Sequence, residues 1–409
     1  MFLLDNPVRR YPWGSTSLVQ QLLGRPLDGR PVAEVWIGAH PDDPSVAAAP
    51  GRRVPLDVLV AGQPEAVLGR RVLATAGPRL PFLTKILAAA HALSVQVHPT
   101  AAQAEAGFAA EERRGVGRDA PERTYRDRSH KPEVLYALTP FELLSGLREP
   151  EQAAKLVAEL EVPALEPLVG LLRDDAPAAG HRAALTWLLH QRGPTPAPWV
   201  EEVARVAEEA AGTRPEVRVV RDLARQFPGD PALVAPLLLN FARLEPGQAL
   251  YTGAGTLHAY LSGMAVEVMA ASDNVLRAGL TTKHVDVDEL LAVTDFTPRL
   301  TGFLRPVRVA PGAVDYVPPV PDFVLSVLTP RAGSVVPGPD DGPRVVVCTA
   351  GEVRVEAGDA RGLRPGDAVL VPDVDGPLTV SGDGTEPPGV ARLDADLARG
   401  AHDHARPVV

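Results

Sequence analysis

The sequence predicts a mainly β protein that carries one inserted helical segment. Three observations support this fold class. The 409 residues include 36 glycines and 43 prolines, which favour many turns and short strands. A sustained helical spacing of apolar residues is confined to a central block, about residues 148 to 236. Two similar Pro-Gly stretches, at 244–255 and 363–374, indicate that one β unit occurs twice.

The first part of the chain consists of short strands and turns. "TSLVQQLLG" (16–24) predicts a short helix that ends at a glycine. "FLTKILAA" (82–89) and "LSVQVHP" (93–99) are apolar runs of strand length, and another strand begins within "VLYAL" (134–138). We therefore assign residues 1–147 to the first part of a β domain.

The central block, residues 148–236, predicts a helical domain inserted into the β-rich chain. Within it, "EPEQAAKLVAEL", "RAALTWLLHQ" and "TPAPWVEEVARVAEEA" each place apolar side chains along one face of a helix. These side chains belong to Leu156, Val157, Leu160, Leu185, Leu188, Leu189, Trp199, Val203, Val206 and Ala210.

The chain after this block returns to short strands, which predict an antiparallel sandwich or barrel. "LEPGQALYTGAG" and "LRPGDAVLVPDV" each run Leu-x-Pro-Gly, then a short apolar strand, then a second turn. The first continues into "TLHAYL" and the second into "DGPLTV", which lacks a histidine. A chance Pro-Gly match is the alternative to duplication. We assign residues 237–300 to the second part of the first β domain, and residues 301–409 to a β domain without metal ligands.

Composition and charge disfavour several classes of partner. The formal net charge is −10, which disfavours nucleic acid and anionic membranes, although a few converging cations can still bind a phosphate. Cys348 is the only cysteine, so no intrachain disulfide is possible, and a cytoplasmic location is expected. We expect neither a signal peptide before Asp5 nor a membrane-spanning helix, because no apolar run reaches ~18 residues. We further expect a monomer.

Four polar residues beside strands suggest a metal site. In "LSVQVHPT", Gln96 and His98 lie two residues apart, so both point to one face of the strand, and the valines point to the opposite face. Glu133 would enter at the head of a second strand, and His258 at the end of a third. Two imidazoles, one carboxylate and one amide oxygen would make four ligands. This set is typical of zinc except for the weak, neutral glutamine.

Each of these residues also has a simpler interpretation. Gln96 or His98 alone could be a hydrogen-bonded residue in a core or at a sheet edge. Lys131 could form a surface ion pair with Glu133, and His258 could lie in a turn. The metal interpretation gains from the position of all four candidate ligands beside apolar strands. The histidine-containing chain end, "AHDHARPVV", is interpreted as a polar tail and not as a metal site.

The segment "VEVMAASDNVLRAGLTTKHVDVDEL" holds a second group of candidate residues. Glu267 lies in an apolar stretch, so it is paired, has a raised pKa, or faces solvent. Arg277 lies in a glycine-containing loop with Asn274 and Lys283. There it could clamp a phosphate or stabilise negative charge that develops during a reaction. The alternative is an ion pair between Arg277 and Asp273.

Several motifs resemble, in order, those of the type I mannose-6-phosphate isomerases, also called phosphomannose isomerases. They are "YPWGS", "AEVWIGAHP", "LPFLTKILAAAHALSVQVHPT", "HKPEVLYALTPFELLSGLR" and "GTLHAYLSGMAVEVMAASDNVLRAGLTTKHVDVDEL". The resemblance runs from about Tyr11 to Leu290, whereas residues 301–409 match only in length and β character. It implies a zinc-dependent cupin enzyme that interconverts mannose 6-phosphate and fructose 6-phosphate. The expected fold is a cupin-type jelly-roll barrel, an inserted helical domain and a second cupin-like domain.

The resemblance also implies roles for individual residues. The zinc ligands of the family, with one ion per chain, correspond here to Gln96, His98, Glu133 and His258. The residues that match its catalytic positions are Arg277, Lys131 and Glu267. The positions that line its substrate pocket are Ser94, Lys85 and Trp13. Core packing is the equal alternative for Trp13. Two departures, Thr282 and Gly253 in place of common prolines, touch no ligand.

An aldose–ketose isomerase moves a proton between C2 and C1 of the sugar through a cis-enediol. The candidate proton carriers are Glu267, Lys131 and His130, among which the sequence does not choose. Arg277 is assigned to the stabilisation of developing negative charge, a role that zinc can share. Lys85 and Ser94 are assigned to the phosphate of the substrate.

Two other functions remain open at this point. Two histidines and one carboxylate also form the facial triad of non-haem iron oxygenases, which cupins host. Gln96 argues against that assignment, because such iron sites need open positions for oxygen. A non-catalytic sugar-phosphate binder on the same scaffold would be favoured by the loss of a ligand or of Arg277. The chain has lost neither.

Overall fold

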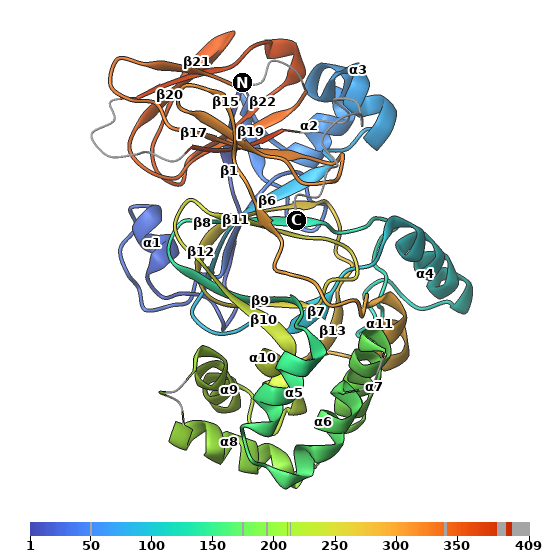
Figure 1. The fold of residues 1–409 in the computed structure, drawn as a ribbon. Helices are drawn as coiled ribbons and strands as arrows, with labels where there is room; N and C mark the ends of the chain where they lie inside the picture. Colours follow the sequence, from blue (N-terminus) through green and yellow to red (C-terminus); the bar gives the residue numbers. More distant parts are fainter. Residues whose placement is uncertain are drawn as a thin grey trace.

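The computed structural model describes residues 1–49, 51–173, 176–193, 195–210, 212, 214–338, 342–382 and 390–394. Strands and helices are arranged in three regions, with a barrel-like sheet between a helical region and a second β region (Figure 1). This arrangement confirms the predicted fold class, mainly β with a helical segment. The histidine-containing chain end considered above lies outside the described residues.

The central region is an eleven-stranded sheet in which all strand pairs are antiparallel. Its strands are β2 (Val8–Arg9), β3 (Glu34–Ile37), β6 (Phe82–Ala89), β7 (Val95–Val97), β8 (Glu133–Ala137), β9 (Phe141–Leu147), β10 (Leu239–Leu244), β11 (Ala249–Thr252), β12 (His258–Ala270), β13 (Leu276–Gly279) and β14 (Phe303–Leu304). The strands predicted around 82–89, 93–99 and 134–138 are therefore confirmed as β6, β7 and β8.

Strand β12 joins two halves of this sheet. Its first residues pair with β7 and β9, and its last residues pair with β6 and β8. Gly263 lies near the change of partners and has a φ of 122°. A Cβ there would stand 2.6 Å from the Pro140 carbonyl oxygen, so only glycine fits the crossing. The long strand thereby carries His258 at one end and Glu267 near the other.

The segment from residue 150 to 238 is helical. It forms α5 (Pro150–Ala158), α6 (Glu166–Leu172), α7 (Pro177–His190), α8 (Pro198–Ala210), α9 (Pro215–Gln226) and α10 (Ala235–Leu238). Several of these helices begin on a proline, which is favoured at the first helical position because its missing N–H would be unpaired there anyway. Prolines in this chain therefore also start helices, besides forming the turns that their number suggested.

The apolar faces of these helices pack against the central sheet. Leu185 and Leu188 share a core with Val95 and Val97 of β7. This contact confirms that the valines of "LSVQVHPT" point away from Gln96. The other helices are α1 (Leu18–Leu22), α2 (Leu56–Gly62), α3 (Pro64–Ala76), α4 (Ala101–Arg114) and α11 (Val287–Val293). Within the described ranges, no helix has the length and apolar character needed to cross a membrane.

The third region contains a nine-stranded and a four-stranded sheet. In spatial order the larger sheet contains β15 (Val307–Ala310), β16 (Ala313–Tyr316), β17 (Val324–Leu328), β24 (Val390–Asp394), β19 (Arg344–Cys348), β22 (Ala368–Val371), β1 (Phe2–Asp5), β4 (Val46–Ala49) and β5 (Arg52–Pro55). The smaller contains β18 (Val335–Pro337), β23 (Thr379–Gly382), β20 (Val353–Ala357) and β21 (Asp359–Leu363).

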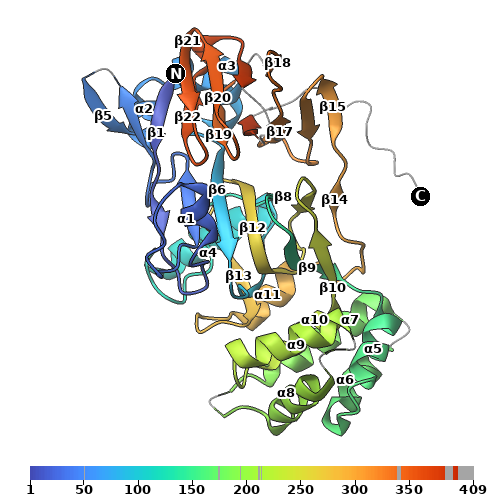
Figure 2. The same ribbon diagram turned by 90° about the vertical axis from the view of Figure 1, so that its left-hand side faces the viewer.

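Strand pairing crosses the predicted domain boundaries. The amino-terminal strand β1 pairs with β22, beside which it lies in Figure 2, although residues 1–147 were assigned to the first β domain. Conversely, β14 pairs with β11, although residues 301–409 were assigned to the last domain. Sequence periodicity identifies a strand but not its partner, because pairing is a tertiary property. The division into domains stays a prediction.

The two Pro-Gly stretches form equivalent turns in the two β regions. Gly247 N–H donates to the Ala137 carbonyl (2.9 Å), and Gly366 N–H donates to the Cys348 carbonyl (2.8 Å). In return, the N–H groups of Ala137 and Cys348 each donate over 3.0 Å to the residue that follows the turn glycine. These matched bonds support the inferred duplication.

The strand register extends this correspondence to the metal site. Glu133 pairs with Thr252 as Arg344 pairs with Val371, so Arg344 occupies the position of Glu133 in the second unit. Arg344 is fully buried and donates to the carbonyls of Pro372 (2.9 Å) and Gly376 (2.7 Å). A cationic guanidinium therefore stands where the first unit has an anionic carboxylate.

Candidate metal centre and substrate pocket

Three candidate site residues lie in one row across neighbouring strands. His258 of β12 pairs with Gln96 of β7, and Arg277 of β13 pairs with the same Gln96. Residues directly opposite each other in antiparallel strands point to the same face. The register therefore brings an imidazole, an amide and a guanidinium together, although they come from distant parts of the sequence.

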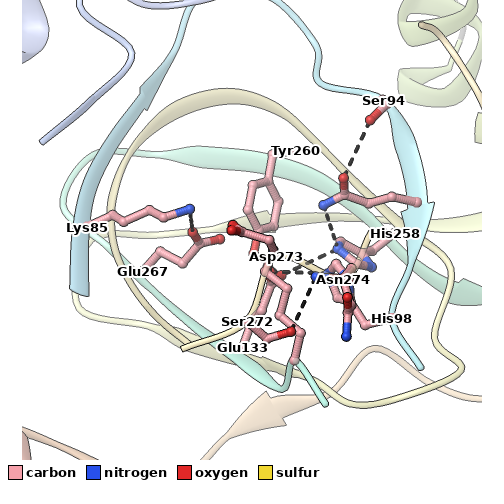
Figure 3. A network of polar contacts seen from close by, with 12 residues as sticks. Lys85, Ser94, His98, Glu133, His258, Tyr260, Glu267, Ser272, Asp273 and Asn274 are labelled. Carbon is pink, nitrogen blue, oxygen red and sulfur yellow. Dashed lines mark hydrogen bonds and ion pairs between the residues drawn. The ribbon is translucent and has the colours of Figure 1, made fainter. Parts of the chain in front are cut away.

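The buried metal cluster consists of His98, Glu133 and His258, each at most 1% exposed. His98 Nε2 lies 3.2 Å from Glu133 Oε1, and His258 Nε2 lies 3.4 Å from Glu133 Oε2 (Figure 3). The Gln96 amide nitrogen lies 3.2 Å from His258 Nε2. A half-turn of this amide would present its oxygen to the same point. Ser94 Oγ lies 3.4 Å from the other end of the amide.

The hydrogen bonds of the two histidines fit a bound cation. His98 Nδ1 donates to the Asn274 carbonyl and His258 Nδ1 donates to the Thr256 carbonyl, each over 2.9 Å. Both Nε2 atoms are then unprotonated and direct their lone pairs at the carboxylate of Glu133. His98 Nε2 is buried without a hydrogen-bond partner among the described residues. An unprotonated imidazole nitrogen that faces an ionised carboxylate is repelled by it. The two histidines and Glu133 therefore suit a bound metal ion.

The surroundings of Glu133 and His98 keep both side chains in the protonation state that binds a metal ion. Burial alone would raise the pKa of Glu133, but Lys131 and His98 hold it well below the ordinary value. Lys131 Nζ lies 2.8 Å from Glu133 Oε1. Burial lowers the pKa of His98 to about 4, so its imidazole is neutral near pH 7. A neutral imidazole and an ionised carboxylate are the forms that bind zinc.

A second row of side chains crosses β3, β6 and β12. Lys85 pairs with Trp36 on one side and with Glu267 on the other. Lys85 Nζ lies 3.2 Å from Glu267 Oε2 and 3.5 Å from Glu34 Oε1, and Trp36 Nε1 donates to Glu34 over 2.8 Å. Of the three interpretations offered for Glu267, a paired carboxylate is therefore the observed one.

The charges of Lys85, Glu34 and Glu267 shift the pKa values of this group. Burial would lower the pKa of Lys85, but Glu34 and Glu267 raise it above the ordinary value. The pKa of Glu267 is also raised, because burial and the nearby Glu133 oppose the effect of Lys85. A buried carboxyl with a raised pKa beside a metal cluster is suited to proton transfer.

Tyr260 links the two rows and was not identified from the sequence. Its hydroxyl donates to Glu133 Oε2 over 3.1 Å, and Figure 3 shows its ring between the histidines and the pair formed by Lys85 and Glu267. Burial, followed by Glu133 and Glu267, raises the pKa of Tyr260 well above its ordinary value. Because Tyr260 lies two residues after His258 on one strand, the alternation rule could have found it.

Asp273 has a different partner from the one considered in the sequence. Its carboxylate lies 3.1 Å from His40 Nε2, and no ion pair between Asp273 and Arg277 occurs among the described residues. Burial would raise the pKa of Asp273, but the hydrogen bond from His40 lowers it. His40 and Asp273 are loop residues far apart in the sequence, so no local pattern pointed to their contact.

Arg277 belongs to a group of cations. Burial, followed by the nearby Arg126, lowers the pKa of Arg277. Burial, followed by Arg277 and Arg126, lowers the pKa of Lys283. The charges of the three side chains therefore act on one another, although Arg126 and Lys283 are exposed and Arg277 is half-buried. Since Arg277 also lies opposite Gln96, this cation group borders the metal cluster and can receive an anion.

Two further candidates have other surroundings. His130 Nε2 lies 3.0 Å from both carboxylate oxygens of Asp322, in the segment between β16 and β17. This nitrogen is therefore directed at the second β region. The ring of Trp13 stacks on Tyr11 with a centroid distance of 5.7 Å and packs partly against a core of the central sheet.

Comparison with known proteins gives a consistent result. A family model described as phosphomannose isomerase type I, catalytic domain, matches residues 1–150. Mannose-6-phosphate isomerase of Salmonella typhimurium is 37% identical over 397 residues, covering 93% of this chain and 97% of that protein. The Escherichia coli mannose-6-phosphate isomerase is 35% identical over 387 residues, with the same coverage of 93% and 97%.

Solved structures agree over nearly the whole chain. A zinc-bound mannose 6-phosphate isomerase matches with a TM-score of 0.87 at 34% identity, covering 96% of this chain and 98% of that one. The Salmonella typhimurium mannose 6-phosphate isomerase bound to fructose 6-phosphate and zinc also matches with a TM-score of 0.87 at 34% identity. That match covers 96% of this chain and 99% of the other.

Proposed function

Because this chain belongs to the type I phosphomannose isomerase family, we propose that it interconverts mannose 6-phosphate and fructose 6-phosphate at the buried metal cluster. The observation that carries the proposal is the pair of imidazole lone pairs directed at Glu133 from His98 and His258. The enzyme is a zinc-dependent aldose–ketose isomerase. A sugar phosphate is its small-molecule partner.

The zinc ion is assigned to His98, Glu133 and His258, with the amide oxygen of Gln96 as a fourth ligand. When bound, zinc supplies a Lewis acid that stabilises negative charge on substrate oxygens. The structure supports the three buried ligands by their spacing, and Gln96 by its position beside His258. We propose one ion per chain, and Arg344 in place of the glutamate argues against a zinc ion at the equivalent position of the second unit.

The phosphate of the substrate is assigned to Arg126, Arg277 and Lys283. This assignment revises the expectation that Lys85 binds the phosphate, since Lys85 is buried between Glu34 and Glu267. A phosphate would offset the repulsion within the cation group, and an arginine can bind it with two parallel hydrogen bonds. The same guanidinium of Arg277 can stabilise charge that develops on the sugar.

Proton transfer is assigned to Glu267. Its raised pKa brings it closer to the pH at which a carboxylate works as a base. Glu267 takes the C2 proton of the open-chain aldose, and the C–H electrons form the C1–C2 double bond while the C1 carbonyl electrons move onto O1. The O2 proton passes to O1, and Glu267 returns its proton to C1, which gives the ketose. His130 is less suited to this task, because its Nε2 is hydrogen-bonded to Asp322.

The test is fructose 6-phosphate formation from mannose 6-phosphate by purified protein, with and without a chelator. Activity should fall with chelation, return with zinc, and be equal with and without oxygen. Dependence on oxygen would support the oxygenase alternative instead. Binding of mannose 6-phosphate without turnover in zinc-loaded protein would support a non-catalytic binder.

The remaining expectations are part of this proposal. They are a monomeric state, a cytoplasmic location, the absence of a nucleic-acid partner, and the division at residues 147, 236 and 300. The net charge of −10 supports the expected lack of nucleic-acid binding. Light scattering of the purified chain would give its molar mass in solution.

A further inference from the structure

Asn274 is fully buried and uses its whole side-chain amide to hold two loops together. Its Nδ2 donates to the carbonyls of Asp127 (2.9 Å) and Ser129 (2.8 Å). Its Oδ1 accepts from the backbone N–H groups of Arg126 (2.8 Å) and Asp127 (3.2 Å). Two donated and two accepted bonds saturate an asparagine side chain, so the position of this residue is tightly specified.

Asp127 completes the same connection from the opposite loop. Its carboxylate accepts from the Asp273 N–H (2.7 Å), the Ser272 hydroxyl (2.9 Å) and the Ser129 N–H (2.8 Å). Ser272 is itself 1% exposed. The segments 126–129 and 272–274 are thus joined by reciprocal hydrogen bonds, which we call the 127–274 lock.

The lock reaches the metal cluster through one backbone atom. The carbonyl oxygen of Asn274 accepts from His98 Nδ1 over 2.9 Å, across a separation of 176 residues. By contrast, His258 Nδ1 donates to Thr256, two residues away on its own chain segment. The orientation and protonation of His98 therefore depend on where the lock places residue 274, whereas those of His258 are set locally.

We infer that Asn274 is a positioning residue for metal binding, acting through its own backbone carbonyl on His98. Partners that orient a histidine ligand commonly change metal affinity by about 10- to 100-fold when they are lost. The inference deepens the proposed function, since it rests on His98 as a zinc ligand. It assigns a task to Asn274, Asp127 and Ser272, none of which is proposed as a metal ligand.

The test is the zinc affinity of Asn274→Ala, measured by competition with a chelator in the absence of substrate. Asn240→Ala is the matched control, because the Asn240 amide also donates to backbone carbonyls, those of Gly146 (3.1 Å) and Arg299 (2.8 Å). We expect zinc to bind Asn274→Ala about 10- to 100-fold more weakly and Asn240→Ala as the wild type does.

A milder variant guards against misfolding of Asn274→Ala. Ser272→Ala removes the hydroxyl bonds to Asp127 and to the Ser129 carbonyl, and the bond that the hydroxyl accepts from the Asn274 N–H, while leaving the side-chain amide of Asn274 in place. It should weaken zinc binding several-fold in a metal-free protein that still unfolds cooperatively in urea. Zinc affinities of both lock variants within about threefold of the wild type would overturn the inference. If the wild-type protein binds zinc normally but has no isomerase activity, the proposed function is wrong and the inference about Asn274 is unaffected.

Discussion

Gln96 and Arg277 lie directly opposite each other on β7 and β13. One strand pair therefore carries both the proposed fourth metal ligand and the arginine proposed to contact the substrate. The two tasks are nevertheless separate, because the guanidinium of Arg277 is cationic and has no acceptor atom with which to bind a metal. This separation can be tested by substitution.

Arg277→Ala should lose activity and keep its zinc. Removal of a single group that stabilises developing charge commonly costs about 100-fold or more in rate. Zinc content, measured by atomic emission after gel filtration, should stay at one ion per chain. Arg308→Ala, an exposed arginine of β15, is the control. If Arg277→Ala were isolated without zinc, the separation of roles would be wrong.

His98→Ala and Glu133→Ala should each lose both zinc and activity. Loss of one ligand from a three- or four-ligand site removes much of its affinity, and both residues are buried in the cluster. The control is His190→Ala, which removes an exposed histidine of α7. Wild-type zinc content in either variant would rule out this site.

Lys283→Met should raise the KM for mannose 6-phosphate about tenfold, which corresponds to ~1.4 kcal/mol of lost binding. The long methionine side chain keeps the volume of the stem but removes the charge that we assign to the phosphate. Inhibition by inorganic phosphate should weaken in parallel. An unchanged KM, together with unchanged phosphate inhibition, would mean that another cation binds the phosphate.

Glu267→Gln should abolish the acid limb of the pH–rate profile. A base acts in its ionised form, so the wild-type rate should fall as the pH drops through the raised pKa of Glu267. The variant should lose about 10²- to 10⁴-fold in kcat. Glu34→Gln removes the other carboxylate near Lys85 and should keep the acid limb. Retention of the limb in Glu267→Gln would exclude Glu267 as the base.

His181 should make the protein less stable as the pH falls below ~6.5, the ordinary pKa of histidine. Burial lowers the pKa of His181 in the folded protein, so the unfolded chain binds more protons in this range. The free energy of unfolding then decreases with falling pH, by at most about 1.4 kcal/mol per pH unit for one group. Above pH ~6.5 both states are neutral and the effect vanishes. Urea unfolding of His181→Gln at pH 7 and 5.5 should show a smaller pH dependence, whereas His190→Gln should match the wild type.

Strand alternation was enough to predict the shared face of Gln96 and His98, since the spacing of two is a local property. It could equally have shown Tyr260, two residues after His258. Three helices between 150 and 238, α5, α7 and α8, were predicted because their apolar spacing is strong. Helices α6, α9 and α10, and the prolines that begin several of the helices, were not predicted.

Other features of the site could not be predicted, because they depend on contacts between distant loops. Asn274 contacts Asp127 across 147 residues, and His40 meets Asp273 without any periodic pattern. The position of β1 beside β22 is likewise set by tertiary pairing. Lys85 was assigned to the phosphate because it matches a pocket position of the family, whereas its two carboxylate neighbours became visible only in the fold.

The most direct test is a zinc titration of the metal-free protein that records bound zinc and the rate of mannose 6-phosphate isomerisation on the same samples. The account predicts that both quantities rise together and reach their plateau at one zinc per chain. Zinc binding at that stoichiometry without a rise in rate, or full activity before any zinc is bound, would contradict it.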